Sequence, residues 1–214
     1  MAAASRTIRA KRAAADRVAK PQARTAATRD RILNAAMAVF ATRGFNNGSL
    51  IEIAEKAGMT HAGVLHHFGT KDQLLVAVLD HRDRADVMNL EGQHPPVGRE
   101  LLSHLVATAQ ANMARAGIVQ AYAVLSAESV TEGHPAQDYF RERFIGLRGM
   151  VAEAFREATP ADVDEARLWQ AAAAVIAAMD GLQVQWLLEQ DAVQMPEAVA
   201  AVIAAMVLWL NQPA

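Results

Sequence analysis

The sequence predicts an all-α fold. Alanine, the strongest helix former, dominates a composition that is 52% hydrophobic but only 5% aromatic. Runs rich in β-branched and aromatic residues, which would predict strands, are scarce. Apolar residues instead recur at the spacing of one helix face, as in Ile32, Leu33, Ala36, Val39 and Phe40.

The first predicted helix runs from Thr28, which can serve as its N-cap, to a stop at Gly44. A turn follows, and Ser49–Glu52 then has the Ser-x-x-Glu pattern of a capping box. This pattern predicts a short second helix that ends near Lys56.

The next two helices also have recognisable ends. Thr60 can cap a third short helix that continues through His67, and Gly69 can end it. The segment Thr70–Gln73 is another capping box, and it opens a fourth helix with an apolar side.

The second and third helices, between Ser49 and Phe68, have the steric pattern of a helix-turn-helix. Ala54 is small where the two helices cross, and Gly58 tolerates the positive φ of a tight turn. Val64 supplies the apolar side chain that the third helix buries against the second. An ordinary hairpin of two packed helices is the alternative interpretation.

Beyond residue 80 the sequence predicts a longer helical region. Pro95 and Pro96 mark Glu91–Gly98 as a loop, and Gly117 is expected to separate two of the later helices. The predicted helices lie near Arg99–Ala116, Ile118–Val130, Ala136–Ala158, Asp162–Gln190 and Pro196–Asn211.

The charge is distributed unevenly although the net charge is only −2. Residues 1–80 hold 12 basic and 6 acidic residues, and the remainder holds 9 basic and 17 acidic residues. This division predicts contact with nucleic acid at the N-terminal end alone. Within it, residues 1–27 are predicted to be a flexible basic arm that follows phosphates, with an inert tail or an organellar transit peptide as alternatives.

No pattern in the sequence indicates catalysis. The absence of cysteine excludes thiolate metal sites and a cysteine nucleophile, and no phosphate-binding or dinucleotide-binding glycine motif occurs. Glu91–His94 spells one Glu-x-x-His, but it falls in the predicted loop. We therefore expect no enzyme, no catalytic residue, no metal site and no cofactor.

The longest apolar run, Ala198–Leu210, has thirteen residues, fewer than the about 18–20 that a membrane span needs. It predicts a buried helix rather than a membrane segment. The expected location is the bacterial cytoplasm, in association with the nucleoid.

The N-terminal region resembles the DNA-binding module of tetracycline-repressor (TetR) family regulators. The resemblance covers about Thr28–Asp80, and Asp180–Gln183 and Trp186–Leu188 resemble the penultimate helix of some members. The matching residues are Arg31, Ile32, Leu33, Ala36, Phe40, Gly44, Phe45, Ile53, Ala54, Ala57, Gly58, His67, Phe68, Lys71, Asp72, Leu74 and Leu75.

The resemblance implies a homodimer whose third helices enter successive major grooves of a palindromic double-stranded DNA operator. Thr60, His61 and Ala62 would reach base edges, and Gly63 would permit close approach to the DNA. His61 has a second interpretation as an ordinary exposed helix residue. Ser49, Leu50, His66, His67 and Lys71 would touch backbone phosphates, although the family commonly has a tyrosine where His66 stands.

The resemblance further implies that residues 81–214 form a ligand-binding and dimerisation domain after a DNA-binding domain over 28–80. The function expected is a repressor that a small, mostly apolar effector releases from DNA; a dimeric protein-interaction scaffold without specific DNA binding is the alternative. Ordinary core packing competes with each assignment in this region. The candidate ligand residues are Met113, Tyr122, Phe140, Phe144 and Gln183, and the candidate dimer contacts are Val202, Met206 and Trp209.

Overall fold

The computed structural model describes residues 2–88, 96–159 and 162–212, with the backbone alone for 2–24 and 84–88. The described residues form helices joined by short turns and contain no strand, which confirms the all-α prediction. The helices are α1 (Ala2–Asn47), α2 (Leu50–Lys56), α3 (His61–Phe68), α4 (Lys71–Met88), α5 (Arg99–Met113), α6 (Ala116–Glu128), α7 (Gln137–Ala158), α8 (Glu165–Leu188) and α9 (Met195–Leu210).

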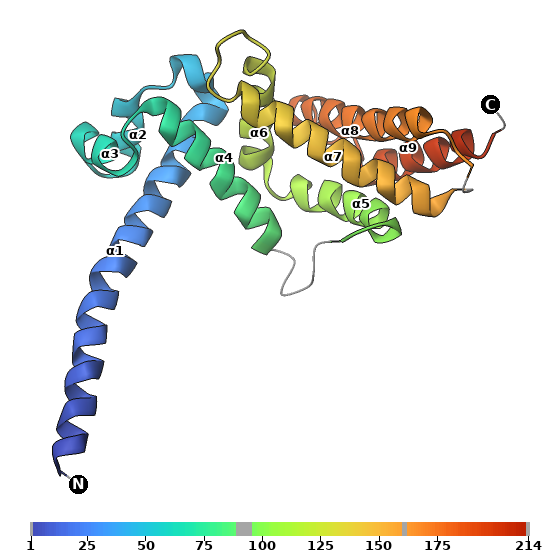
Figure 1. Ribbon diagram of the computed structural model, residues 1–214. Helices are drawn as coiled ribbons and strands as arrows, with labels where there is room; N and C mark the ends of the chain where they lie inside the picture. The colour runs from blue at the N-terminus through green and yellow to red at the C-terminus, as the bar shows by residue number, and fades with distance from the viewer. Residues whose placement is uncertain (1, 89–95, 160–161, 213–214) are drawn as a thin grey trace.

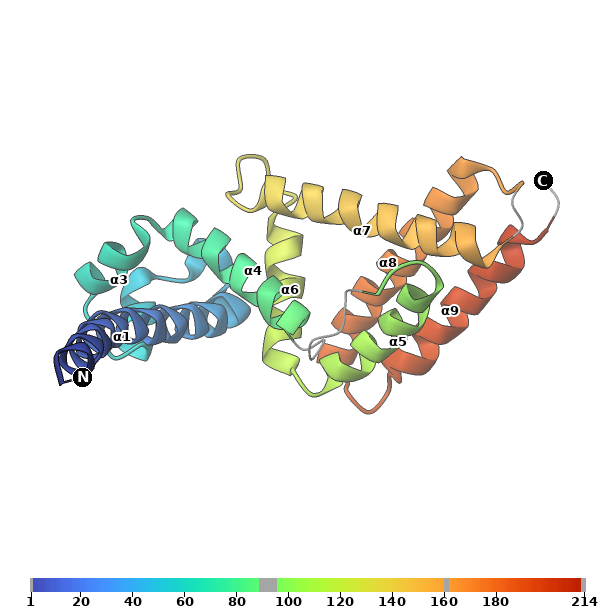
Figure 2. The ribbon, with the colours of Figure 1, turned by 60° about the horizontal axis from the view of Figure 1, so that its bottom comes forward.

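Helices α1 to α4 form one end of the molecule and α5 to α9 form the other (Figure 1). Helices α2 and α3 lie beside the second half of α1, and α4 leads from α3 toward the rest of the chain. The view in Figure 2 shows α6 standing between the two ends, with α7, α8, α9 and α5 packed beyond it.

Helix α1 begins much earlier than the sequence analysis predicted. Thr28 lies inside this helix and does not cap it, and residues 2–27, expected to be a flexible arm, form its first part. The physical reason is the alanine-rich composition of this segment, because alanine has the highest helix propensity. The predicted stop at Gly44 is confirmed by its φ of 71°, which interrupts the helical backbone.

The predicted break at Gly117 is wrong. The chain turns at Ala114 and Arg115, and Gly117 lies in the first turn of α6. Arg115 leaves the helical region with φ −130° and ψ 44°, and its guanidinium donates to the Asn112 side-chain oxygen at 3.0 Å. A glycine near a helix start costs little there, so it did not mark the boundary.

Two apolar cores hold the molecule together. One surrounds the buried side chains of α1 to α4, such as Ile32, Phe40 and Leu74, and it also includes Tyr122 of α6 and Phe140 of α7. The other lies among α5, α7, α8 and α9, and the half-buried Phe144 packs against both. The helix-turn-helix therefore shares its core with the middle of the chain.

Helix α8 is long and apolar enough to cross a membrane if length and composition alone are considered. It packs against α7 and α9, however, and its Leu168, Ala171 and Val175 lie in the second core. A core helix of a bundle has these same properties.

Candidate functional site

The helix-turn-helix is built from local hydrogen bonds that its sequence dictates. The Ser49 hydroxyl accepts from the backbone N–H of Glu52 at 3.0 Å, and the Thr60 hydroxyl accepts from that of Gly63 at 3.1 Å. Between them Gly58 takes a φ of 66°, and the Met59 N–H donates back to the Ala54 carbonyl at 3.0 Å. These contacts fix the turn between α2 and α3.

Helix α3 buries one side and exposes the other. Val64 and Phe68 lie in the core that also holds Ala54 of α2. Ala62 and His66 are exposed on the opposite side, and Thr60 and His61 are exposed at the N-terminal end of the helix. The result is a short rod with an open outer face, which is the geometry that a groove-reading helix needs.

Gly63 has a structural reason for lacking a side chain. A Cβ atom there would lie 2.9 Å from Cε of Met59 and 3.3 Å from the Thr60 hydroxyl. The capping contact and the turn that precedes α3 therefore restrict this position, independently of the close approach to DNA that the sequence analysis expected.

The remaining predicted DNA-contact residues lie at neighbouring helix starts and along α3. Ser49 is exposed, and Leu50 and His67 are half-buried. The Lys71 ammonium donates to the Asn46 carbonyl at 3.3 Å and lies 4.5 Å from the centre of the Phe45 ring. Burial lowers the pKa of Lys71.

The sequence analysis missed Arg29, which attaches α1 to the end of α3. Its guanidinium donates to the His67 carbonyl at 2.8 Å and lies 4.2 Å from the centre of the Phe68 ring. No local pattern could have identified this contact, because 38 residues separate Arg29 from His67.

It also missed Glu128, which ties the end of α6 to the end of α1. The Phe45 N–H donates to the Glu128 carboxylate at 2.6 Å, and a Cβ atom at Gly44 would collide with that carboxylate. His134 packs edge-on against the Phe45 ring at 5.2 Å, and burial lowers the pKa of His134. Glu128 and His134, from the end of α6 and the segment after it, thus contact the helix-turn-helix region directly.

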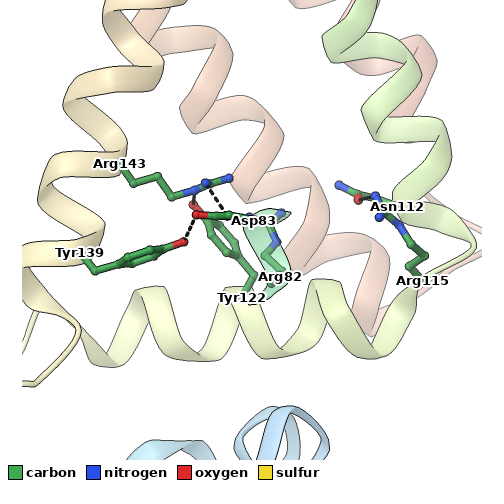
Figure 3. A network of polar contacts seen from close by, with 7 residues as sticks. All are labelled: Arg82, Asp83, Asn112, Arg115, Tyr122, Tyr139 and Arg143. Atoms are coloured by element: carbon green, nitrogen blue, oxygen red, sulfur yellow. Dashed lines mark hydrogen bonds and ion pairs between the residues drawn. The ribbon is translucent and has the colours of Figure 1, made fainter. Parts of the chain in front are cut away.

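A polar network joins α4, α6 and α7 beside the first apolar core (Figure 3). Asp83 of α4 accepts from the Tyr139 hydroxyl at 2.5 Å and from the Arg143 guanidinium at 2.8 Å, both on α7. Arg143 also donates to the Tyr122 hydroxyl of α6 at 3.1 Å, and Arg82 lies 4.5 Å from the centre of the Tyr122 ring. Burial raises the pKa of both tyrosines, so their hydroxyls stay protonated.

A hollow of about 240 Å³ lies between α6 and α8, beside this network. Of the predicted ligand residues, Tyr122 and Gln183 line it. Phe140 lies in the first core, Met113 packs against the second, and Phe144 contacts both, so these three do not line the hollow.

Asp180 of α8 also lines the hollow, and the sequence analysis did not select it. Burial raises the pKa of this carboxyl to about 6, partly opposed by the positive charges of Arg143 and Arg82. Its signal in the sequence is a single acidic residue in an otherwise apolar stretch of helix.

The predicted dimer contacts Val202, Met206 and Trp209 are half-buried against the second core of their own chain. Arg167 donates to the Trp209 carbonyl at 2.5 Å and lies 4.8 Å from the centre of its ring. Other large apolar side chains of these two helices point outward. They are Trp169, Val184 and Leu188 on α8, and Leu208 on α9.

Among the described residues, no three His, Asp or Glu side chains gather into a group that could hold a metal ion. Glu91–His94, which spells the Glu-x-x-His pattern, lies outside those residues.

The chain is similar to known bacterial regulatory proteins. Residues 32–78 match the family model described as bacterial regulatory proteins, tetR family. The chain is 30% identical over 180 residues to the HTH-type transcriptional regulator TtgR of Pseudomonas putida, covering 78% of this chain and 84% of TtgR. It is 52% identical over 50 residues to the HTH-type transcriptional repressor Rv3405c of Mycobacterium tuberculosis, but there it spans only 27% of the relative.

Solved structures with the same fold cover most of the chain. A transcriptional regulator from Rhodococcus sp. Rha1 superposes with a TM-score of 0.66 and 20% identity, over 85% of this chain and 95% of that one. NalD of Pseudomonas aeruginosa, described as the secondary repressor of the MexAB-OprM multidrug efflux pump, superposes with a TM-score of 0.60 and 21% identity, over 85% and 96%.

Proposed function

Because the chain belongs to the TetR family of DNA-binding transcriptional regulators, we propose that it is a homodimeric repressor that leaves a palindromic operator when a small molecule binds. Regulators of this family are generally not enzymes. A repressor of this kind acts in the bacterial cytoplasm, on the nucleoid.

The observation that carries the proposal is the exposed outer face of α3. Thr60, His61 and Ala62 stand at its N-terminal end, where recognition helices contact base edges. The other candidates lie along α3 and at the starts of α2 and α4, and we assign the polar ones to backbone phosphates. They are Ser49, Leu50, Gly63, His66, His67 and Lys71.

Two-fold pairing is the second part of the proposal. Helix-turn-helix dimers bind half-sites about 34–36 Å apart, so two copies must hold their α3 helices at that spacing. Leu188 is 84% exposed on α8, and Leu208 is 67% exposed on α9. We place the dimer interface on this outward apolar face, with Val202, Met206 and Trp209 supporting it from the core side.

The effector would act through α4. This helix follows α3 after a two-residue turn, and its Asp83 is held by Tyr139 and Arg143 of α7. A molecule bound beside Tyr122 that moves Arg143 would change the position of α4 and hence the spacing of the two α3 helices. Coupling of about 1–3 kcal/mol is typical and would change DNA affinity by roughly 5–150-fold.

The salt dependence of DNA binding tests the function. A repressor is expected to prefer one palindrome selected from a random library and to lose affinity steeply as salt rises, because phosphate contacts release counterions. Equal, weak binding to all sequences with a flat salt response would favour the protein-interaction scaffold.

His61→Ala tests the assignment of α3. If His61 reads a base, the variant discriminates less at one operator position, by about 1–3 kcal/mol. His104→Ala, the same change on α5, is the control and should leave operator binding unchanged. Uniform weakening on all sequences would assign His61 to a phosphate instead.

Leu208→Glu tests the pairing surface. Sedimentation should show monomers, because the substitution introduces a charge into the apolar face. Val130→Glu is a matched control, since Val130 is 81% exposed and lies in the turn after α6. A Leu208→Glu variant that sediments as a dimer would place the interface elsewhere.

A further inference from the structure

The hollow between α6 and α8 has the walls of a small binding site. Ala123 and Ala127 line it from α6, and Gly181 and Val184 line it from α8. A Cβ atom at Gly181 would meet nothing within 4 Å, so the wall leaves open space there. The volume of about 240 Å³ is below the roughly 300–1,000 Å³ of sites for drug-sized ligands. The hollow therefore suits a smaller molecule with an apolar body.

Two polar side chains of α8 meet this space without a hydrogen bond to the described part of the protein. Gln183 is 9% exposed, and neither its amide nor the half-buried Asp180 carboxylate makes such a bond. A ligand can therefore hydrogen-bond to Asp180 or Gln183 without displacing a bond within the described residues.

Tyr122 supplies the complementary group from α6. Its hydroxyl oxygen accepts from Arg143, so its proton remains available to donate into the hollow. Donor and acceptors thus come from two helices that face each other across the hollow.

The charges around the hollow select against an ionic ligand. Among the residues that the structure describes there, Arg82 and Arg143 are positive and Asp83 and Asp180 are negative, so these four charges cancel when both carboxyls are ionised. A charged ligand would leave a net charge in a partly buried site, which is costly. The ligand that fits carries no charge.

We propose that the hollow binds a small uncharged alcohol or phenol whose O–H donates to Asp180 and whose oxygen accepts from Tyr122. A hydroxyl group both donates and accepts, so one group satisfies both helices. This inference names the chemical class of the effector, and it therefore rests on the proposed function. Ala127 lines the site, and the next residue, Glu128, accepts from the Phe45 N–H. A ligand against α6 therefore lies beside a contact that joins α6 to the helix-turn-helix region.

The test uses four probes that share one ethylphenyl body. They are 4-ethylphenol, its methyl ether 4-ethylanisole, the anion 4-ethylbenzoate and the cation 4-ethylbenzylamine. Calorimetry with the full chain should show binding of 4-ethylphenol, with each of the other three at least tenfold weaker. The ether has no O–H to donate to the Asp180 carboxylate, and the loss of one hydrogen bond to a charged group weakens binding by roughly that factor.

Two variants locate the site. Asp180→Leu should remove the preference for 4-ethylphenol over 4-ethylanisole. Ala123→Leu should weaken all binding because it fills the hollow, whereas Gln120→Leu, at an exposed position of α6 outside the lining, should not. Circular dichroism checks that each variant folds.

The inference is overturned if no probe binds, if the ether or an ion binds as tightly as 4-ethylphenol, or if the preference survives Asp180→Leu. The wild-type protein is assayed for operator binding without any probe in parallel. Intact operator binding together with failed probe binding rejects this inference alone, and absent operator binding rejects the proposed function.

Discussion

The two ends of the molecule begin their helices by different means. In the DNA-facing end, side chains cap α2, α3 and α4, through Ser49, Thr60 and the reciprocal pair Thr70 and Gln73. In the other end, the N-cap residues of α5, α6, α7, α8 and α9 make no side-chain capping hydrogen bond. The Arg99 N–H at the start of α5 donates instead to the distant Glu157 carboxylate of α7 at 3.1 Å. Helix ends there are set by packing between distant segments.

The two ends therefore differ in what holds their helices in place. Caps act over three residues, so they fix the starts of α2, α3 and α4 locally, while Arg29 and the shared core hold the rest of α3 in place. Helices that depend on packing alone can shift when a neighbour or a ligand changes that packing. A rigid reader is thus joined to an adaptable body.

The largest expected effect is in the body. Phe155 is fully buried in the second core, so Phe155→Ala should lower the free energy of unfolding by about 3–5 kcal/mol. Urea unfolding followed by tryptophan fluorescence measures it, because all three tryptophans lie on α8 and α9. Val130→Ala, at an exposed site, is the control. A loss below 1 kcal/mol would contradict packing as the main support of the body.

The second effect concerns Asp180. Its folded-state pKa of about 6 lies above the ordinary 3.8, so the folded protein binds the extra proton and stability falls as pH rises from 4 to 6. Asp180→Asn should remove this loss and be more stable at pH 7 by up to about 3 kcal/mol, with no gain at pH 4. Thermal unfolding across this pH range measures the difference, with the exposed Asp164→Asn as the control. Parallel pH curves for Asp180→Asn and wild type would refute it.

The junction between the two ends gives the third effect. Gly44→Ala strains a positive φ, which costs about 1–2 kcal/mol, and its Cβ displaces the Glu128 carboxylate from the Phe45 N–H. Gly133→Ala has the same strain at φ 77° but meets nothing within 4 Å. Urea unfolding should therefore show a loss about 1 kcal/mol larger at Gly44, which is the typical contribution of the lost hydrogen bond. Equal losses would show that Glu128 contributes nothing.

The smallest effect tests the caps themselves. Thr60→Ala should cost about 1 kcal/mol, because it removes a hydrogen bond to the Gly63 N–H. Asp164 precedes α8 without making such a bond, so Asp164→Ala should stay within about 0.5 kcal/mol of wild type. Urea unfolding compares the two variants, and similar losses would remove the distinction between the two ends.

The same distinction explains what the sequence could predict. The caps at Ser49, Thr60 and Thr70 and the turn at Gly58 depend on residues a few positions apart, and the structure confirms them. The start of α1 and the break near Gly117 were mistaken, because single capping or glycine residues were given more weight than the helix-forming sequence around them.

Contacts across long separations could not be predicted. Phe45 and Glu128 are 83 residues apart, and Asp83 and Arg143 are 60 apart. In the candidate ligand site, Tyr122 and Gln183 were selected for their polar groups in an apolar region, and they do line one hollow. Asp180 lies in the segment Asp180–Gln183 that resembles the family, but its role in the candidate ligand site follows only from its burial and its charged neighbours in the folded protein.

The core that Phe40 and Leu74 share with Tyr122 and Phe140 has a consequence for evolution. A gene fusion that joined a foreign reader to this sensor at residue 80 would cut α4 and set unrelated side chains against α6 and α7. Exchange of binding specificities between relatives is therefore constrained to changes on the outer face of α3, or to recombination that carries both sides of the shared core together.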